Sequence, residues 1–196
     1  NSCSSLIPLK ERKCIVLWVG GAHSARNDCE ISLVVENATS TSAKNLLYSE
    51  ALKLDLTGVL YLVMVDGSSD LIELRDYGRS AGDPWSTFER YLLEWEPAVG
   101  VPHSLSSDYS GEKEAQEVFN FDQAVVAFHI EAAPLLLPFW EFDDDDDSWR
   151  PSGTAQATVA HAAYQHHVVQ FNAIRVVLAN VSSEGIALHT LKKYVL

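Results

Sequence analysis

The sequence predicts an all-β fold, a single antiparallel β-sandwich of eight or nine short strands. Short β-rich runs alternate with turn-forming residues along most of the chain, with no strand–helix alternation and no repeat of fixed period. At 196 residues and 47% hydrophobic composition, the chain is large and apolar enough to bury a full core. We therefore expect one domain over residues 14–196, preceded by a polar N-terminal arm over residues 1–13.

Strands are predicted where apolar or alternating residues lie between turn signals. The clearest is Val59 to Val65, which follows Gly58 and precedes the turn pair Asp66-Gly67. The predicted strands, in chain order, are 14–19, 31–36, 59–65, 71–75, 91–96, 126–130, 171–179 and 186–195. We expect the third and fourth to pair with each other and the last two to form a closing pair across a turn. The runs 59–65 and 125–130 should form the core.

Three further assignments complete the chain. Residues 43–56 favour a short helix followed by a strand, because their leucines do not repeat cleanly at helical spacing. Loops are predicted at 77–84, 99–109 and 143–153, and residues 154–169 fit either a helix or a strand.

The period-two pattern at 91–96 predicts a strand with one buried face. Tyr91, Leu93 and Trp95 form one set, and they alternate with Leu92 and two glutamates.

The negative charge of the chain lies in one stretch. Residues 91–149 hold 14 Asp and Glu and one basic residue, Lys113, whereas the remainder holds 13 acidic and 13 basic residues. This distribution accounts for the net charge of −13 and argues against a nucleic-acid-binding surface, which needs clustered Lys and Arg. No run approaches the roughly 20 apolar residues of a membrane span.

The cysteines favour a reducing compartment. Cys3, Cys14 and Cys29 are odd in number and confined to the beginning of the chain, unlike the disulfide framework of a secreted domain. Two triplets, at Asn37 and Asn180, match the glycosylation pattern, and chance matches of this kind are common.

Two groups of residues could bind a metal. The five carboxylates Asp143, Asp144, Asp145, Asp146 and Asp147 could chelate calcium, but the run lacks the alternation and glycine of an EF-hand loop. A solvated loop is the alternative interpretation, and we favour it.

The second group is His161, His166 and His167, whose spacing suits neither a helical nor a strand zinc site. We therefore expect no cofactor and no metal.

No residues form a readable catalytic set. The chain has no Gly-x-Ser-x-Gly elbow and no glycine-rich phosphate loop. Glu94 and Glu96 have the spacing of paired carboxylates, which solvated strand edges also show. We therefore expect the protein not to be an enzyme.

The tryptophans could stack on sugars or pack between protein subunits. Trp85, Trp140 and Trp149 lie in or beside the predicted loops, where a monomeric protein rarely leaves large apolar side chains bare. We predict that these three residues form subunit interfaces.

The order of motifs resembles the capsid jelly roll of picorna-like plus-strand RNA viruses. The resemblance rests on Leu92 to Pro97, Gly100 to Ser104, Val126 to Ile130, and the proline-rich corner Pro134 to Trp140. At the corner, Glu131 to Pro134 departs from the isoleucine-proline-tyrosine of that family.

Two further segments extend the resemblance. Thr57 to Tyr61 is similar to the start of an earlier strand of the roll, and 171–195 is similar to its last two strands. The resemblance implies a jelly-roll antiparallel β-sandwich that was cleaved from a polyprotein. The size would suit the small coat protein of a plant comovirus or fabavirus.

The resemblance implies a structural capsid subunit of a non-enveloped icosahedral virus. Its partners would be other capsid subunits, with no strong contact to genomic RNA and none to a membrane. Its location would be the virion, and the host cytoplasm during assembly. The alternative function is a carbohydrate-binding, lectin-like β-sandwich, which the tryptophans, acidic loops and sequons favour.

Overall fold

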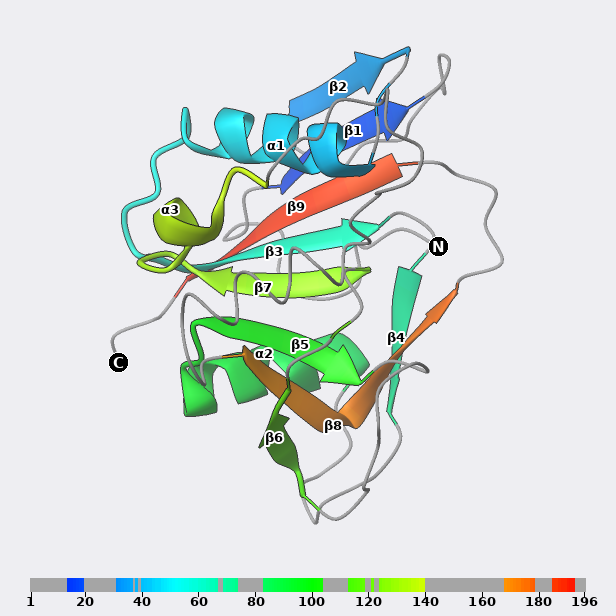
Figure 1. Ribbon diagram of the computed structural model, residues 1–196, viewed down its shortest axis with the longest axis vertical. Coiled ribbons are helices and arrows are strands. Elements are labelled where there is room, and N and C mark those ends of the chain that lie inside the picture. Colours follow the sequence, from blue (N-terminus) through cyan, green and yellow to red (C-terminus); the bar gives the residue numbers. More distant parts are fainter. Residues whose placement is uncertain are drawn as a thin grey trace, which may run out of the picture.

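The computed structural model shows a β-rich chain with few helices (Figure 1). It describes residues 14–19, 31–36, 38, 40–66, 69–73, 83–103, 113–118, 121, 124–139, 168–178 and 185–192. Within this part, nine strands form one curled sheet. The prediction of a mainly β fold is confirmed. The predicted N-terminal arm, residues 1–13, lies outside the described residues.

Nine strands and three helices make up the described chain. The strands are β1 (Cys14–Val19), β2 (Ile31–Val35), β3 (Val59–Asp66), β4 (Ser69–Glu73), β5 (Val99–His103), β6 (Ala115–Glu117), β7 (Val125–His129), β8 (Val168–Leu178) and β9 (Gly185–Lys192). The helices are α1 (Ser40–Ala51), α2 (Pro84–Trp95) and the short α3 (Ala133–Leu136).

The strands follow the order β2-β1-β9-β3-β7-β5-β8-β4 across the sheet, with β6 pairing beside β8. The pairs β1–β2 and β5–β8 are parallel, and the other pairs are antiparallel. Antiparallel pairing throughout, as predicted, is therefore wrong for two pairs. A parallel pair needs a long crossover connection, and β6, β7 and α3 all lie between β5 and β8.

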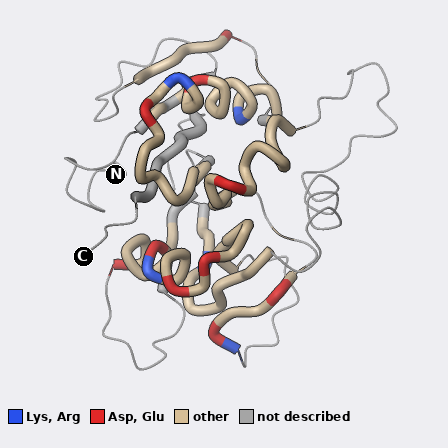
Figure 2. Tube along the Cα trace, turned by 90° about the vertical axis from the view of Figure 1, so that its left-hand side faces the viewer, with Lys and Arg blue, Asp and Glu red and all other residues tan. Residues whose placement is uncertain are grey.

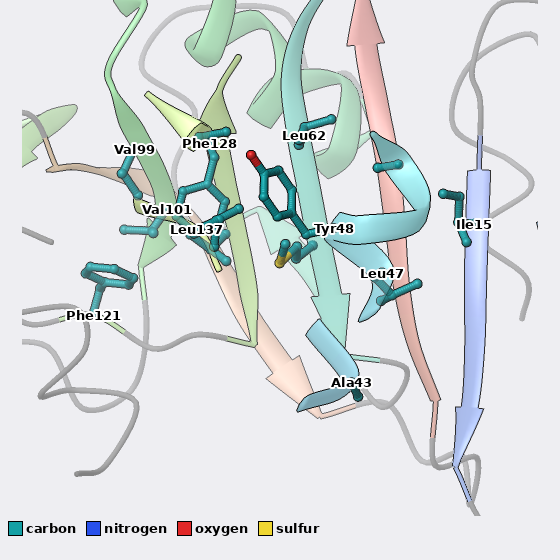
Figure 3. Packing of buried hydrophobic residues seen from close by; sticks show 14 of the residues in the cluster. Ile15, Ala43, Leu47, Tyr48, Leu62, Val99, Val101, Phe121, Phe128 and Leu137 are labelled. Carbon is teal, nitrogen blue, oxygen red and sulfur yellow. The ribbon is translucent and has the colours of Figure 1, made fainter. Parts of the chain in front are cut away.

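Helices pack on both faces of the sheet, and a separate apolar core lies on each face. On β3, Leu62 and Met64 point into one core, which α1 and α3 complete. Tyr61, Val63 and Val65 point into the other, which α2 completes. Figure 1 shows α1 and α2 on opposite sides of the sheet, and Figure 3 shows the α1 side at close range. A strand buried on both faces reads as one continuous apolar run, as 59–65 does.

The strand predicted over 91–96 is wrong, because these residues belong to α2. Asp83 caps the helix by accepting hydrogen bonds from the backbone amides of Trp85 and Ser86, and Pro84 occupies the first turn. The buried side chains, which recur at helical spacing, are Trp85, Thr87, Phe88, Tyr91 and Leu92. The alternation of apolar and polar residues over 91–96 is a weaker signal than the helix cap at Asp83 and the helical spacing of apolar residues over three turns.

Two other assignments of local structure are corrected. The predicted strand at the end of 43–56 is absent, since α1 ends at Ala51 and β3 begins only at Val59. Residues 99–103 form β5 and not a loop; their side chains are all buried, a pattern that the nearby glycine and proline obscured.

Strand pairing also differs from the prediction. β4 pairs with β8 and not with β3, and β8 and β9 lie in different parts of the sheet. Several strands, such as β4, therefore pair with strands that are distant in the sequence, because the chain crosses the sheet repeatedly.

Candidate functional site

One end of the sheet carries exposed apolar side chains among carboxylates. There, at the left of Figure 1, α2 ends, β7 ends and α3 begins. Trp95 is 50% exposed, Leu93 37% and Leu135 69%. We call this end of the sheet, where Leu93 and Trp95 of α2 and Leu135 of α3 are exposed, the apolar end (Figure 1).

The end of α2 is fixed by its cap and by the strands beneath it. Glu96 adopts a left-handed conformation, with φ 40° and ψ 50°, and its amide donates to the carbonyl of Leu92. Pro97 then accepts a hydrogen bond from the buried Tyr61 hydroxyl at 2.8 Å. This bond attaches the chain leaving α2 directly to β3.

The end of β7 lies beside the same segment. The amide of His129 donates to the carbonyl of Ala98 at 2.9 Å, and the amide of Ile130 donates to that of Leu60 at 2.8 Å. The rings of Tyr61 and His129 meet edge to face, with centroids 5.2 Å apart. The chain then turns directly into α3, so α2 and α3 are held at one end of the sheet.

The position of α3 is set from the other side by α1. Asn45 Nδ2 donates to the carbonyl of Phe139 at 2.8 Å, and the amide of Phe139 donates to Asn45 Oδ1 at 2.7 Å. Ala133 and Leu137 are buried in the core below, whereas Leu135 faces out. Leu135 is therefore kept at the surface by the burial of Ala133 and Leu137 and by the bonds between Asn45 and Phe139.

The charge around the apolar end is negative. Glu94, Glu96 and Glu131 are exposed, and residues 91–103 and 124–139 contain no Lys or Arg. Figure 2 looks onto this end and shows the acidic positions of α2 in red. The one basic residue of this helix is Arg90, one turn before Leu93. A surface of this kind suits a partner that offers apolar side chains and positive charge.

The titratable groups of this end do not provide an evident catalytic pair. Burial, followed by the nearby Glu96 carboxylate, raises the pKa of Tyr61 well above its usual range. Its hydroxyl stays protonated and donates to Pro97. His129 Nδ1 accepts from the amide of Glu131 at 3.3 Å. The arrangement offers contact area rather than a reacting group.

Of the residues predicted as interface or metal sites, the structure describes only Trp85. Trp85 is 8% exposed and packs edge to face with Phe88, with ring centroids 6.5 Å apart, so it lies in the core of the single chain. Its position in the first turn of a helix, missed in the sequence, explains this burial. Trp140, Trp149 and the run Asp143–Asp147 lie outside the described residues.

The exposure of Trp95 was not predicted, because residues 91–96 were assigned to a strand and not to a helix. A helix beginning at Asp83-Pro84 gives the correct result: Trp85, Phe88 and Leu92 point inward, and Leu93 points outward. The signal was present in the sequence, in the cap and in the spacing of the aromatic residues.

Within the described residues, no group of three His, Cys, Asp or Glu side chains could hold a metal ion. No helix in that part of the chain is long and apolar enough to cross a membrane. Comparison with models of protein families, with curated proteins and with solved structures gave no match.

Proposed function

We propose that this chain is a structural subunit that assembles with other protein chains through the apolar end. The observation that carries the proposal is the half-exposed Trp95 in the last turn of α2, at the same end of the sheet as the exposed Leu93 and Leu135 (Figure 1). Tryptophan is among the residues that contribute most to binding energy at protein interfaces. Several large apolar side chains exposed at one end of a sheet are the kind of surface that a partner covers.

The particular assembly that we propose is a viral capsid. The sequence resemblance supports it, as does the absence of a readable catalytic set among the described residues. The partners would be other coat subunits, and the location would be the virion. In the jelly-roll form of this proposal the strands would divide into two facing antiparallel sheets. The described strands instead form one sheet with two parallel pairs, so the assembly function rests on the interface and not on that topology.

The test is the association state of the full chain and of surface variants. Trp95→Ser and Leu135→Ser should each weaken self-association at least about tenfold, the equivalent of about 1.4 kcal/mol. Val34→Ser is the matched control, because Val34 is 58% exposed but lies on the outer strand β2. Sedimentation velocity across a concentration series measures the effect, and electron microscopy shows whether the oligomers are shells.

A lectin predicts different results from the same material. Trp95 beside carboxylates could also stack on a sugar ring. A chain that stays monomeric at high concentration, and whose Trp95 fluorescence changes on addition of oligosaccharides but not in Trp95→Ser, would overturn the assembly proposal. Circular dichroism of each variant establishes that the fold is retained.

A further inference from the structure

A chain of buried polar groups joins β5, β8 and the segment before β6. His103 is 6% exposed, and Gln170 and Asn172 are fully buried. Gln170 Nε2 lies 2.7 Å from Asn172 Oδ1 and 3.3 Å from His103 Nδ1. Asn172 Nδ2 donates to the carbonyl of Lys113 at 2.9 Å. We call these four groups the polar chain; it connects segments that are distant in the sequence.

The direction of every hydrogen bond in the polar chain follows from the Lys113 carbonyl at one end of it. The carbonyl of Lys113 can only accept, so Asn172 must present its amide nitrogen there. Asn172 Oδ1 then faces Gln170, which must present Nε2. Because Nε2 can only donate, His103 Nδ1 must accept. The ring of His103 is therefore neutral, with its proton on Nε2.

A protonated His103 does not fit this arrangement. Both ring nitrogens of an imidazolium donate, so Nδ1–H would face the N–H groups of Gln170. Turning over the Gln170 amide would bring two oxygens together at Asn172, and turning over Asn172 as well would do the same at Lys113. No exchange of amide orientations within the polar chain accepts the added proton.

We propose that His103 is an acid-sensitive latch, which fastens the Lys113–Val118 segment to β5 and β8 when neutral and releases it when protonated. Two main-chain bonds would loosen with it: Asn172 N to Glu114 O, at 2.9 Å, and Val118 N to Val168 O, at 3.1 Å. The proposal does not rest on the assembly function. It assigns a conformational response to pH to one edge of the sheet.

Burial and the charge of Arg175 oppose protonation of His103. Arg175, on β8, is its register partner across the β5–β8 pair. Burial, and then the charge of Arg175, lower the pKa of His103. Lys113, Glu114 and Glu117 are the other charged residues of the segment, and Glu114 Oε1 accepts from the Tyr91 hydroxyl at 2.5 Å.

One acceptor close to the latch offers an alternative position for the protonated ring. Gln170 Oε1 is buried and has no hydrogen-bond partner among the described residues. It sits across the amide carbon from Nε2, so His103 can reach it only if the ring or the amide moves. Such a movement would break the contact with Gln170 Nε2 and hence the polar chain.

The pH range follows from the lowered pKa. The unfolded chain binds a proton at His103 near the ordinary value of about 6.5, and the folded chain binds it only at lower pH. The stability contributed by the neutral latch is therefore complete above about 6.5 and is lost progressively as the pH falls from there towards the folded-state pKa.

Nuclear magnetic resonance of the wild-type full chain tests the latch without any substitution. The nitrogen shifts of His103 should show a proton on Nε2 and none on Nδ1 at neutral pH, and the ring should titrate below 6.5. Amide exchange, corrected for its intrinsic pH dependence, should accelerate at least tenfold at 113–118 between pH 7 and a pH below the His103 titration measured in the same samples, but not on β3. A ring protonated on Nδ1 at neutral pH, or unchanged protection of 113–118, would overturn the proposal.

A non-titrating variant provides the second test. His103→Gln can still accept from Gln170 through its amide oxygen, so protection of 113–118 should become independent of pH over this range. His129→Gln is the control; that histidine lies outside the polar chain, and its replacement should leave the pH response intact. An unchanged response in folded His103→Gln would assign the effect to another group.

Discussion

Gly100 shows how closely α2 approaches the sheet. A Cβ atom added at this position would lie 2.3 Å from Leu92 Cδ2 and 3.3 Å from Phe171 Cε2. Leu92 belongs to α2 and Phe171 to β8, so a single missing methyl group allows the helix, β5 and β8 to meet. The sequence contains no sign of this contact, because a glycine between two nearby prolines, Pro97 and Pro102, also fits a turn.

We expect Gly100→Ala to destabilise the fold by about 1–3 kcal/mol, since the core must shift to accept the added carbon. Gly58→Ala is the comparison: Gly58 has open space around it but a φ of +75°, so only backbone strain of about 1 kcal/mol should arise. Urea unfolding of both variants measures the difference. A Gly100→Ala chain as stable as wild type would contradict the close approach of α2.

At the scale of single elements, continuous apolar runs were the most predictable. The runs 59–65 and 125–130 were expected as core strands and are β3 and β7, because uninterrupted burial leaves an unambiguous apolar sequence. The helix α2 was missed because its exposed face is also apolar, at Leu93 and Trp95. Pairing was not predictable, since β4 and β8 meet through contacts far apart in the sequence. The same wrong assignment hid the apolar end.

Asn45 ties α1 to the chain that leaves α3, and its removal should be costly. Asn45→Ala would leave the amide and carbonyl of Phe139 without their side-chain partner, at about 1–3 kcal/mol for each group that stays buried. Asn45→Asp retains the acceptor but loses the donor, so its effect should be intermediate. Thermal unfolding of the two variants gives the order, and an equal effect of both would contradict the paired geometry.

At the scale of the whole molecule, one sheet separates two cores. Val125 and Val126 are adjacent on β7 and both fully buried, but they belong to different cores. A sandwich of the predicted kind would bury only one of two such neighbours in its interior. Because helices pack on both faces of the sheet, both valines are buried and both contribute to a core.

Val125→Ala and Val126→Ala should therefore destabilise the protein by similar amounts, about 1.5–3 kcal/mol each from lost burial and the cavity left behind. Val34→Ala, at a position 58% exposed on β2, should change stability by less than about 0.5 kcal/mol. Chemical denaturation measures all three. A near-neutral effect at either β7 position would show that one face of the sheet is open.

The place of β9 in the sheet has a consequence for synthesis. Among the described strands, β1 and β2 join the rest of the sheet through β9 alone, which lies between β1 and β3. On the ribosome the two early strands must wait for β9, a delay on the order of ten seconds at ordinary elongation rates. During that time their apolar side chains and open edges are accessible to chaperones or to other nascent chains. β9 therefore completes the sheet. Pairings between strands this far apart in the sequence are expected to form slowly.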